Sequence, residues 1–140
     1  MIVDSSAIVA MLKGEPEAAS FVAALLGSDE TVISAANYLE AGIVIDGERD
    51  VAISARLDRL LARSNIEVVS VTPSQARLAR QAYRDFGKGS GHPAKLNFGD
   101  CFAYALARER NQPLLFKGDD FAQTDVKVAD VKAAISCPNS

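Results

Sequence analysis

Residues 1–12, Met-Ile-Val-Asp-Ser-Ser-Ala-Ile-Val-Ala-Met-Leu, place a short apolar run directly before an acid and a helical pattern directly after it. The apolar run predicts a buried strand over residues 1–4 that ends at Asp4. Ser5 or Ser6 is well placed to cap the helix that follows. A strand that leads at once into a helix is typical of the opening of an α/β fold.

The same alternation of strand and helix continues along the chain. Further strands are expected at 31–34, 66–71 and 113–116, with a weaker edge strand at 126–128, and helices are expected from Pro16 to Gly27, over 35–47, around 53–61, and over 73–86 and 98–110. This order favours an α/β sandwich with a central, mostly parallel sheet flanked by helices. A length of 140 residues fits one domain, expected over 1–140.

Apolar spacing identifies the helix faces that are expected to be buried. The helix after Pro16 is expected to bury Phe21, Val22, Leu25 and Leu26, and the helix over 35–47 to bury Leu39, Ile43 and Val44.

Composition narrows the class of protein. With 18 acidic and 15 basic residues, the net charge of -3 argues against bulk electrostatic coating of nucleic acid, so any contact with nucleic acid must be local. The apolar runs are interrupted by charge well before the roughly 20 residues that a membrane span needs. Asp4 stands where a signal peptide carries basic residues, and Cys101 and Cys137 give no disulfide framework. We therefore expect a cytoplasmic protein.

Acidic residues follow the expected strands. Asp4 ends the first strand, Asp119 and Asp120 follow the last one, Glu40 lies in the helix after the second strand, and Asp100 lies in the first turn of a helix. Ligand sites in parallel sheets gather beyond the carboxyl ends of the strands, so these side chains can face one edge. Glu40 and Asp100 stand among uncharged residues, and a charge in such surroundings usually has a partner.

A cation is the partner that such a group of carboxylates requires, because the charges would otherwise repel one another. Mg²⁺ prefers oxygen ligands and commonly bridges carboxylates to a phosphate oxygen. Zinc is not expected, because the sequence has no cluster of histidine and cysteine. Taken singly, Asp4 could instead cap a helix, Asp100 could favour a helix dipole and Asp119 could be a turn residue.

Four stretches, 1–7, 34–40, 96–107 and 113–121, contain these acids in a specific order and spacing. With them the sequence resembles the PIN-domain family, and specifically the toxin nucleases of VapBC toxin-antitoxin modules. The resemblance implies a PIN-like three-layer sandwich and an endoribonuclease that depends on Mg²⁺ or Mn²⁺. It also implies an RNA substrate, a cognate VapB-type antitoxin that blocks the site, and a homodimer.

The resemblance also implies roles for individual residues. Asp4, Glu40 and Asp100 match the acid positions of the family, and Ser6 matches a small hydroxyl position that supports the metal site. We expect Asp4 and Asp100 to bind the metal directly and Glu40 and Asp119 to act through metal-bound water. The ion, or a pair of ions, would orient and deprotonate a water for in-line attack on a phosphodiester.

The fourth acid is where the sequence departs from the family. Many relatives carry Thr-x-Asp before an aromatic residue, whereas this chain has Phe-Lys-Gly at 116–118. The carboxylate must therefore come from Asp119 or Asp120, and Asp119 is the preferred choice.

Basic stripes and a glycine-rich loop complete the candidates. Two stripes of basic residues at helical spacing could hold phosphates or could be solvated faces. The first is Arg56, Arg59 and Arg63, and the second is Arg77, Arg80 and Arg84, with Lys88 and Lys95 in the loop that follows. Residues 87–97 are expected to form a surface loop and lack the spacing of a phosphate-binding P-loop. His92 in this loop is expected to be a surface residue rather than a general base.

Other functions for this chain length are a receiver-like signalling module, a haloacid-dehalogenase-type phosphatase and a non-catalytic PIN-fold scaffold. A receiver needs an aspartate after a middle strand, where Ser70 to Thr72 stand, and the phosphatase needs a second acid where Ser6 stands. The scaffold remains open, because the order of the acids alone does not exclude it.

Overall fold

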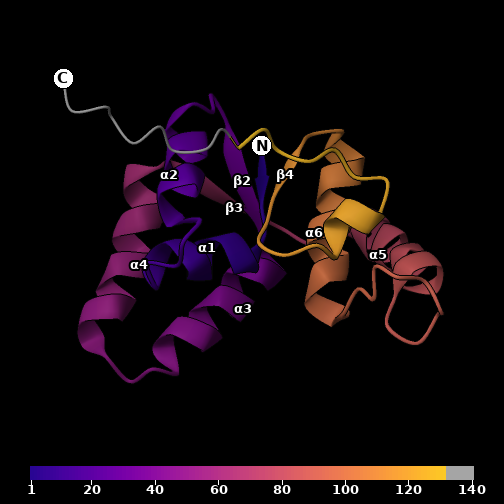
Figure 1. Ribbon diagram of the computed structural model, residues 1–140, viewed down its shortest axis with the longest axis horizontal. Helices are drawn as coiled ribbons and strands as arrows, with labels where there is room; N and C mark the ends of the chain where they lie inside the picture. Colours follow the sequence, from indigo (N-terminus) through magenta and orange to yellow (C-terminus); the bar gives the residue numbers. More distant parts are fainter. Residues whose placement is uncertain (132–140) are drawn as a thin grey trace.

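The computed structural model describes residues 1–131, so Cys137 lies outside the described residues. Its elements follow the expected alternation (Figure 1). They are β1 (Ile2–Val3), α1 (Ser5–Leu12), α2 (Ala18–Leu26), β2 (Thr31–Ser34), α3 (Ala35–Asp46), α4 (Val51–Arg63), β3 (Ile66–Val69), α5 (Pro73–Phe86), α6 (Phe98–Arg110), β4 (Leu114–Leu115) and a 3-10 turn at Phe121–Gln123. Among the described residues, no helix combines the length and the apolar character that crossing a membrane requires.

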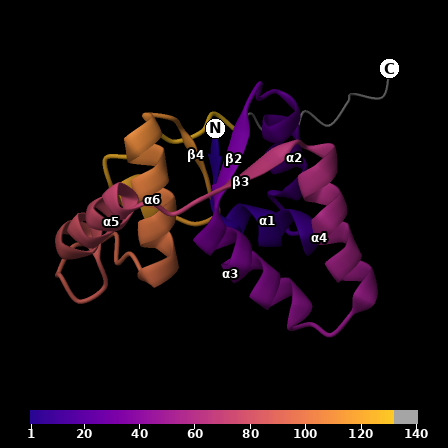
Figure 2. The ribbon, with the colours of Figure 1, turned by 180° about the vertical axis from the view of Figure 1, so that it is seen from behind.

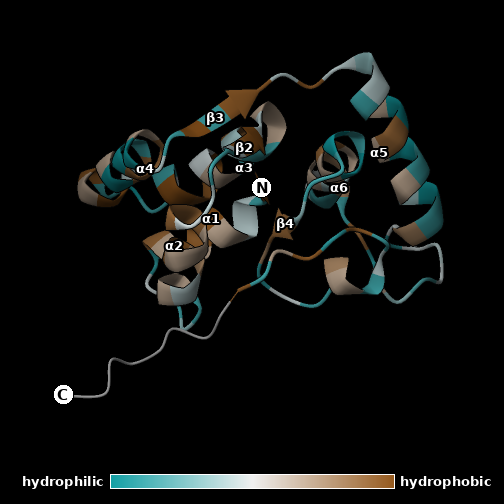
Figure 3. Cartoon of the chain, turned by 90° about the horizontal axis from the view of Figure 1, so that it is seen from above, coloured by the Kyte–Doolittle hydropathy of each residue, from teal (hydrophilic) through white to brown (hydrophobic). Residues whose placement is uncertain are grey.

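The strands form one parallel sheet in the order β3-β2-β1-β4. Seen from behind and from above, α5 and α6 lie on one side of the sheet, and α1, α2 and α4 lie on the other (Figures 2 and 3). The expected α/β sandwich with three layers and a parallel sheet is therefore confirmed. Because all strands run the same way, their carboxyl ends meet at a single edge.

Each face of the sheet supports its own hydrophobic core, since successive strand residues point to opposite faces. Ile2 and Val32 pack with α5, α6 and Leu114, whereas Val3 and Ile33 pack with the helices on the other face. All four strand side chains are at most 1% exposed. β1 and β2 are thus buried on both faces, whereas the edge strand β3 exposes Glu67 and Val68.

The edge strand expected at 126–128 is reduced to a single bridge between Leu114 and Val128. Leu114 N–H donates to the carbonyl of Lys127 at 2.8 Å, and Ala129 N–H donates to the carbonyl of Leu114 at 3.0 Å. These bonds protect the outer edge of β4 without extending the sheet by a full strand.

The buried face predicted for α3 is wrong. Leu39 is 60% and Ile43 is 63% exposed, and Val44 is also exposed, whereas α3 buries Asn37, Ala41 and Ile45. These buried positions are spaced by four residues and therefore share one side of a helix. Ala41 and Ile45 pack in the core with residues of α1, and Asn37 bonds to Gly99 of α6, so contacts with neighbouring helices overrode the stripe of larger apolar residues.

The prediction for α2 is partly wrong in the same way. Phe21 and Leu25 are buried as expected, but Val22 and Leu26 are exposed, Leu26 by 78%. The interior covers only one narrow stripe of α2, so a pair of apolar residues in sequence cannot both be buried there.

Candidate active site: an acid cluster at the carboxyl edge of the sheet

Asp4 follows β1 directly and joins the sheet to α1. Its backbone is extended, and its Oδ2 accepts a hydrogen bond from the backbone N–H of Ser6 at 3.0 Å, so Asp4 is the N-cap of α1. The predicted cap by Ser5 or Ser6 is wrong, because both residues are already helical. Asp4 is only 2% exposed, and its second oxygen, Oδ1, is buried with no hydrogen-bond partner in the described part of the chain. The capping role thus uses one carboxylate oxygen and leaves the other available.

Glu40 reaches the same edge from α3. Its Oε1 accepts a hydrogen bond from the hydroxyl of Ser5 and a longer one of 3.4 Å from Asn37 Nδ2. Asn37 is completely buried and also donates to the carbonyl of Gly99 at 2.9 Å. The Glu40 carboxylate is therefore held between α1, α3 and α6.

Gly99 leaves the space that the Glu40 carboxylate occupies. A Cβ atom built on Gly99 would lie 1.9 Å from Glu40 Oε2, which is a severe overlap. Sequence reasoning missed Ser5, Asn37 and Gly99 as parts of the site. Asn37 was detectable, because it is a polar residue three positions before Glu40 in an otherwise apolar helix.

Asp100 comes from the first turn of α6. It forms a capping box with Asn97, in which Asn97 N–H donates to Asp100 Oδ2 at 3.0 Å and Asp100 N–H donates to Asn97 Oδ1 at 2.9 Å. Burial raises the pKa of Asp100 to about 6, the bond from Asn97 lowers it, and the charges of Asp120 and Glu40 raise it further. Asp100 is thus both a helix cap and a member of the acid group.

The carboxylates interact electrostatically. Burial is the main cause that raises the pKa of Asp4 to about 7. The hydrogen bonds from Ser6 lower this pKa, and the charges of Asp100 and Glu40 raise it further. We call Asp4, Glu40 and Asp100 the acid cluster. A cation that entered it would relieve both the burial and the repulsion of these charges.

The segment after β4 brings the candidate fourth acids to this edge. Lys117 N–H donates to the hydroxyl of Ser6 at 3.0 Å, which ties the segment to α1. Asp119 and Asp120 are both exposed. Asp120 is the residue of this pair whose charge contributes to the raised pKa of Asp100, although Asp119 was the preferred choice from sequence.

The acid cluster fits Mg²⁺ in its donor chemistry. Within residues 1–131, no three acidic, histidine or cysteine side chains converge into a ready-made cage for an ion. Mg²⁺ does not need one, since it keeps several waters and is usually bound through one or two carboxylates. A buried carboxylate oxygen without a partner is the donor that such an ion would satisfy, and Asp4 Oδ1 is in that state.

His92 supports its own loop rather than the acid cluster. His92 packs its ring edge-on against Phe86 and accepts a hydrogen bond from Ala94 N–H at 3.0 Å, so it stabilises the loop.

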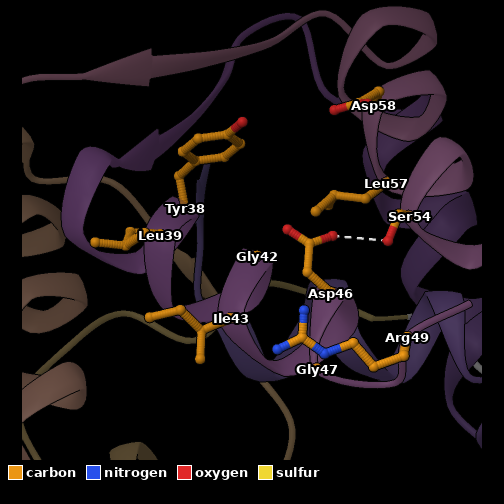
Figure 4. A pocket seen from close by; sticks show the side chains of 10 residues that line it. All are labelled: Tyr38, Leu39, Gly42, Ile43, Asp46, Gly47, Arg49, Ser54, Leu57 and Asp58. Carbon is orange, nitrogen blue, oxygen red and sulfur yellow. Dashed lines mark hydrogen bonds between the residues drawn. The ribbon is translucent and has the colours of Figure 1, made fainter. Parts of the chain in front are cut away.

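A separate hollow of about 440 Å³ lies between α3 and α4, where Asp46 accepts a hydrogen bond from Ser54 at 2.7 Å (Figure 4). The exposed Leu39 and Ile43 line this hollow, which we call the α3–α4 hollow.

Comparison with known proteins agrees with this architecture. Residues 1–127 match the PIN domain. The chain is 57% identical to Ribonuclease VapC28 of Mycobacterium tuberculosis, over 92% of this chain and 97% of that protein. It is 50% identical to Ribonuclease VapC42 of the same organism, over 92% and 98%.

Solved structures show the same fold. The M. tuberculosis toxin VapC20, described as cleaving the sarcin-ricin loop, superposes with a TM-score of 0.69 at 15% identity, covering 89% of this chain and 95% of that one. A chain of a toxin-antitoxin complex from Klebsiella pneumoniae superposes with a TM-score of 0.64 at 17% identity, covering 86% and 89%. Together with the sequence matches, these similarities establish that the chain belongs to the PIN domain family and, within it, to the VapC group.

Proposed function

We propose that this protein is an endoribonuclease that hydrolyses RNA phosphodiester bonds at the acid cluster with the help of Mg²⁺ or Mn²⁺. The observation that carries the proposal is Asp4 Oδ1, a buried carboxylate oxygen without a partner beside two further acids. The chain's relatives VapC28 and VapC42 are named ribonucleases, which supports RNA as the substrate.

Asp4 and Asp100 are the residues that would hold the ion, because Asp4 has a buried oxygen without a partner and the charge of Asp100 helps to raise the pKa of Asp4. When bound, the ion would supply Lewis acidity at the phosphate and acidify a coordinated water. Both Asp4 and Asp100 also use an oxygen as a helix cap, so their carboxylates are oriented before any ligand arrives.

Glu40 is the residue that we assign to the attacking water. Hydrolysis needs a water in line with the leaving oxygen and an acceptor for its proton. Ser5 and Asn37 both donate to Oε1 of Glu40, which fixes the carboxylate while Oε2 lies against Gly99. We assign the fourth carboxylate to Asp120, on the strength of its electrostatic interaction with Asp100.

The test is cleavage of a labelled RNA during a titration with MgCl₂. The wild-type protein should cleave only with the metal, and Asp4→Asn or Asp100→Asn should remain folded by circular dichroism and lose cleavage. Asp29→Asn, an exposed site outside the acid cluster, is the matched control and should cleave like the wild type. A folded wild-type protein without metal-dependent cleavage would leave the PIN fold as a binding scaffold.

We also propose that the protein is the toxin of a toxin-antitoxin pair. One of its structural neighbours is part of such a complex. The α3–α4 hollow offers a place for the partner, since exposed apolar side chains that line a hollow commonly mark protein interfaces. The expected homodimer and the cytoplasmic location stay predictions.

A further inference from the structure

A second pocket lies between α5 and α6, near the first turn of α6. It has a volume of about 650 Å³, which is within the usual range for small-ligand sites. We call it the aromatic pocket, and its lining is formed by Ala76, Ala79, Arg80, Tyr83, Lys88, Asn97, Phe98, Cys101 and Phe102. The pocket is therefore mostly apolar, with two cations at its border.

Phe98 presents its ring to solvent beside this pocket. It is 79% exposed, although it is a large apolar residue. Phe102, one helical turn further along α6, contacts the Phe98 ring edge-on at a centroid distance of 4.9 Å. This contact limits the orientations of Phe98, so the exposed ring is a preformed surface on which a flat group can stack.

The two cations of the pocket are available to an anion. Among the described residues, neither Arg80 nor Lys88 takes part in an ion pair. Lys88 is held in place through its backbone, because its N–H donates to the carbonyl of Leu96 at 2.8 Å and its carbonyl accepts from the Tyr83 hydroxyl at 3.0 Å. The backbone of Lys88 is thus fixed at the aromatic pocket, which places two cations there in a protein whose net charge is -3.

The pocket adjoins the acid cluster through Asn97, the N-cap of α6. Asn97 and Phe98 line the pocket, and Asn97 exchanges two hydrogen bonds with Asp100. Gly99, which lies between Phe98 and Asp100 in α6, packs against Glu40. A chain of nucleotides with one phosphate at the acid cluster would therefore place a neighbouring nucleotide at Phe98.

We propose that the aromatic pocket binds one unpaired nucleobase of the RNA next to the scissile phosphate, with Phe98 stacking on the base and Arg80 and Lys88 binding adjacent phosphates. Single-stranded RNA fits these features, because its splayed bases stack on aromatic side chains while basic side chains follow its backbone. The inference rests on the proposed ribonuclease function and adds that substrate choice includes a single-stranded base at this position.

The experiment measures binding of fluorescently labelled single-stranded RNA by anisotropy, in EDTA so that the metal-dependent reaction cannot run. Each RNA is compared with versions that lack the base of one nucleotide at a time. In the wild type, removing the base at one position of the RNA should weaken binding about tenfold. Phe98→Ala should weaken binding of the intact RNA by about the same factor. Removing that base should then have no further effect on the affinity of Phe98→Ala. Ala76→Met, which fills the pocket from α5 without touching the acid cluster, should act like Phe98→Ala.

The cations have a matched control. Arg80→Gln should weaken binding and lower the slope of log Kd against log salt by about 0.7. Arg59→Gln makes the same change in charge on α4, across the sheet from α5 and α6 (Figure 2), and should leave the affinity and the salt dependence unchanged.

The outcomes separate this inference from the proposed function. If the wild type cleaves RNA with Mg²⁺ but Phe98→Ala and Ala76→Met keep its affinity and its sensitivity to base removal, the pocket inference alone is overturned. It is equally overturned if these variants change only the oligomeric state in sedimentation, since the pocket would then be a protein interface. If the wild type neither binds nor cleaves any RNA, the proposed function fails and the inference fails with it.

Discussion

Replacing Asp4 by asparagine should make the metal-free protein more stable at alkaline pH. Burial is the main reason that the pKa of Asp4 rises from 3.8 to about 7, so the folded state holds the proton more tightly than the unfolded chain. Stability from this group is therefore fully present below about pH 4 and is lost as the pH rises towards about pH 7. The ionised Asp4 is a cost that the fold carries at alkaline pH.

The magnitude follows from the shift. At about 1.4 kcal/mol per pKa unit, Asp4 costs about 4 kcal/mol near pH 8, where it is ionised in both states. Near pH 5 it costs roughly 2 kcal/mol, because the folded protein holds a proton that the unfolded chain has released. An asparagine keeps an oxygen to accept the N–H of Ser6, so the cap of α1 survives. Its amide group would stand where Asp4 Oδ1 has no partner, which offsets about 1–2 kcal/mol of the gain. A net gain of about 2 kcal/mol near pH 8 remains.

Urea unfolding in EDTA near pH 5 and near pH 8 measures this effect, with Asp29→Asn as the control. The wild type should lose stability between the two pH values, and Asp4→Asn should lose less, with the residual loss arising from Asp100, whose pKa is also raised. Added MgCl₂ should stabilise the wild type and leave Asp4→Asn unchanged. The reasoning is refuted if Asp4→Asn is less stable than the wild type near pH 8, or if the two proteins show the same pH dependence.

Three further outcomes are expected. Gly99→Ala should displace the Glu40 carboxylate and reduce RNA cleavage at least about tenfold. The control is Gly42→Ala, at a helical glycine with open space around it, which should cleave normally and unfold at a urea concentration equal to or above that of the wild type. Equal cleavage by both variants would contradict the placement of Glu40. Asp120→Asn should reduce cleavage more than Asp119→Asn, and the opposite order would restore the choice made from sequence. Leu39→Asp should weaken co-purification with the protein encoded by the adjacent reading frame while RNA cleavage is retained, and intact co-purification would exclude the α3–α4 hollow as the antitoxin site.

The layers and the three central acids could be predicted from sequence for a local reason. A strand that ends at Asp4 and a helix that begins near Asp100 are recognisable from a few neighbouring residues. The parallel order of the strands then brings both acids to one edge. The placement of residues at strand ends is therefore predictable from sequence.

The predictions that failed concern features that depend on contacts between segments distant in sequence. Which face of α3 is buried is decided by its packing against α1 and by the bond from Asn37 to the carbonyl of Gly99, 62 residues away. The support of Glu40 by Ser5 spans 35 residues. Apolar periodicity contains no information about such pairs, so Leu39 and Ile43 were expected inside and are found outside.

The position of a bound metal tests the central claim most directly. A crystal of the full chain soaked in MnCl₂ should give an anomalous difference peak at about 2–2.4 Å from Asp4 Oδ1, with Asp100 as a second ligand and no peak in Asp4→Asn. A well-ordered crystal with an empty acid cluster at millimolar MnCl₂, or with the peak only at other carboxylates, would contradict the account.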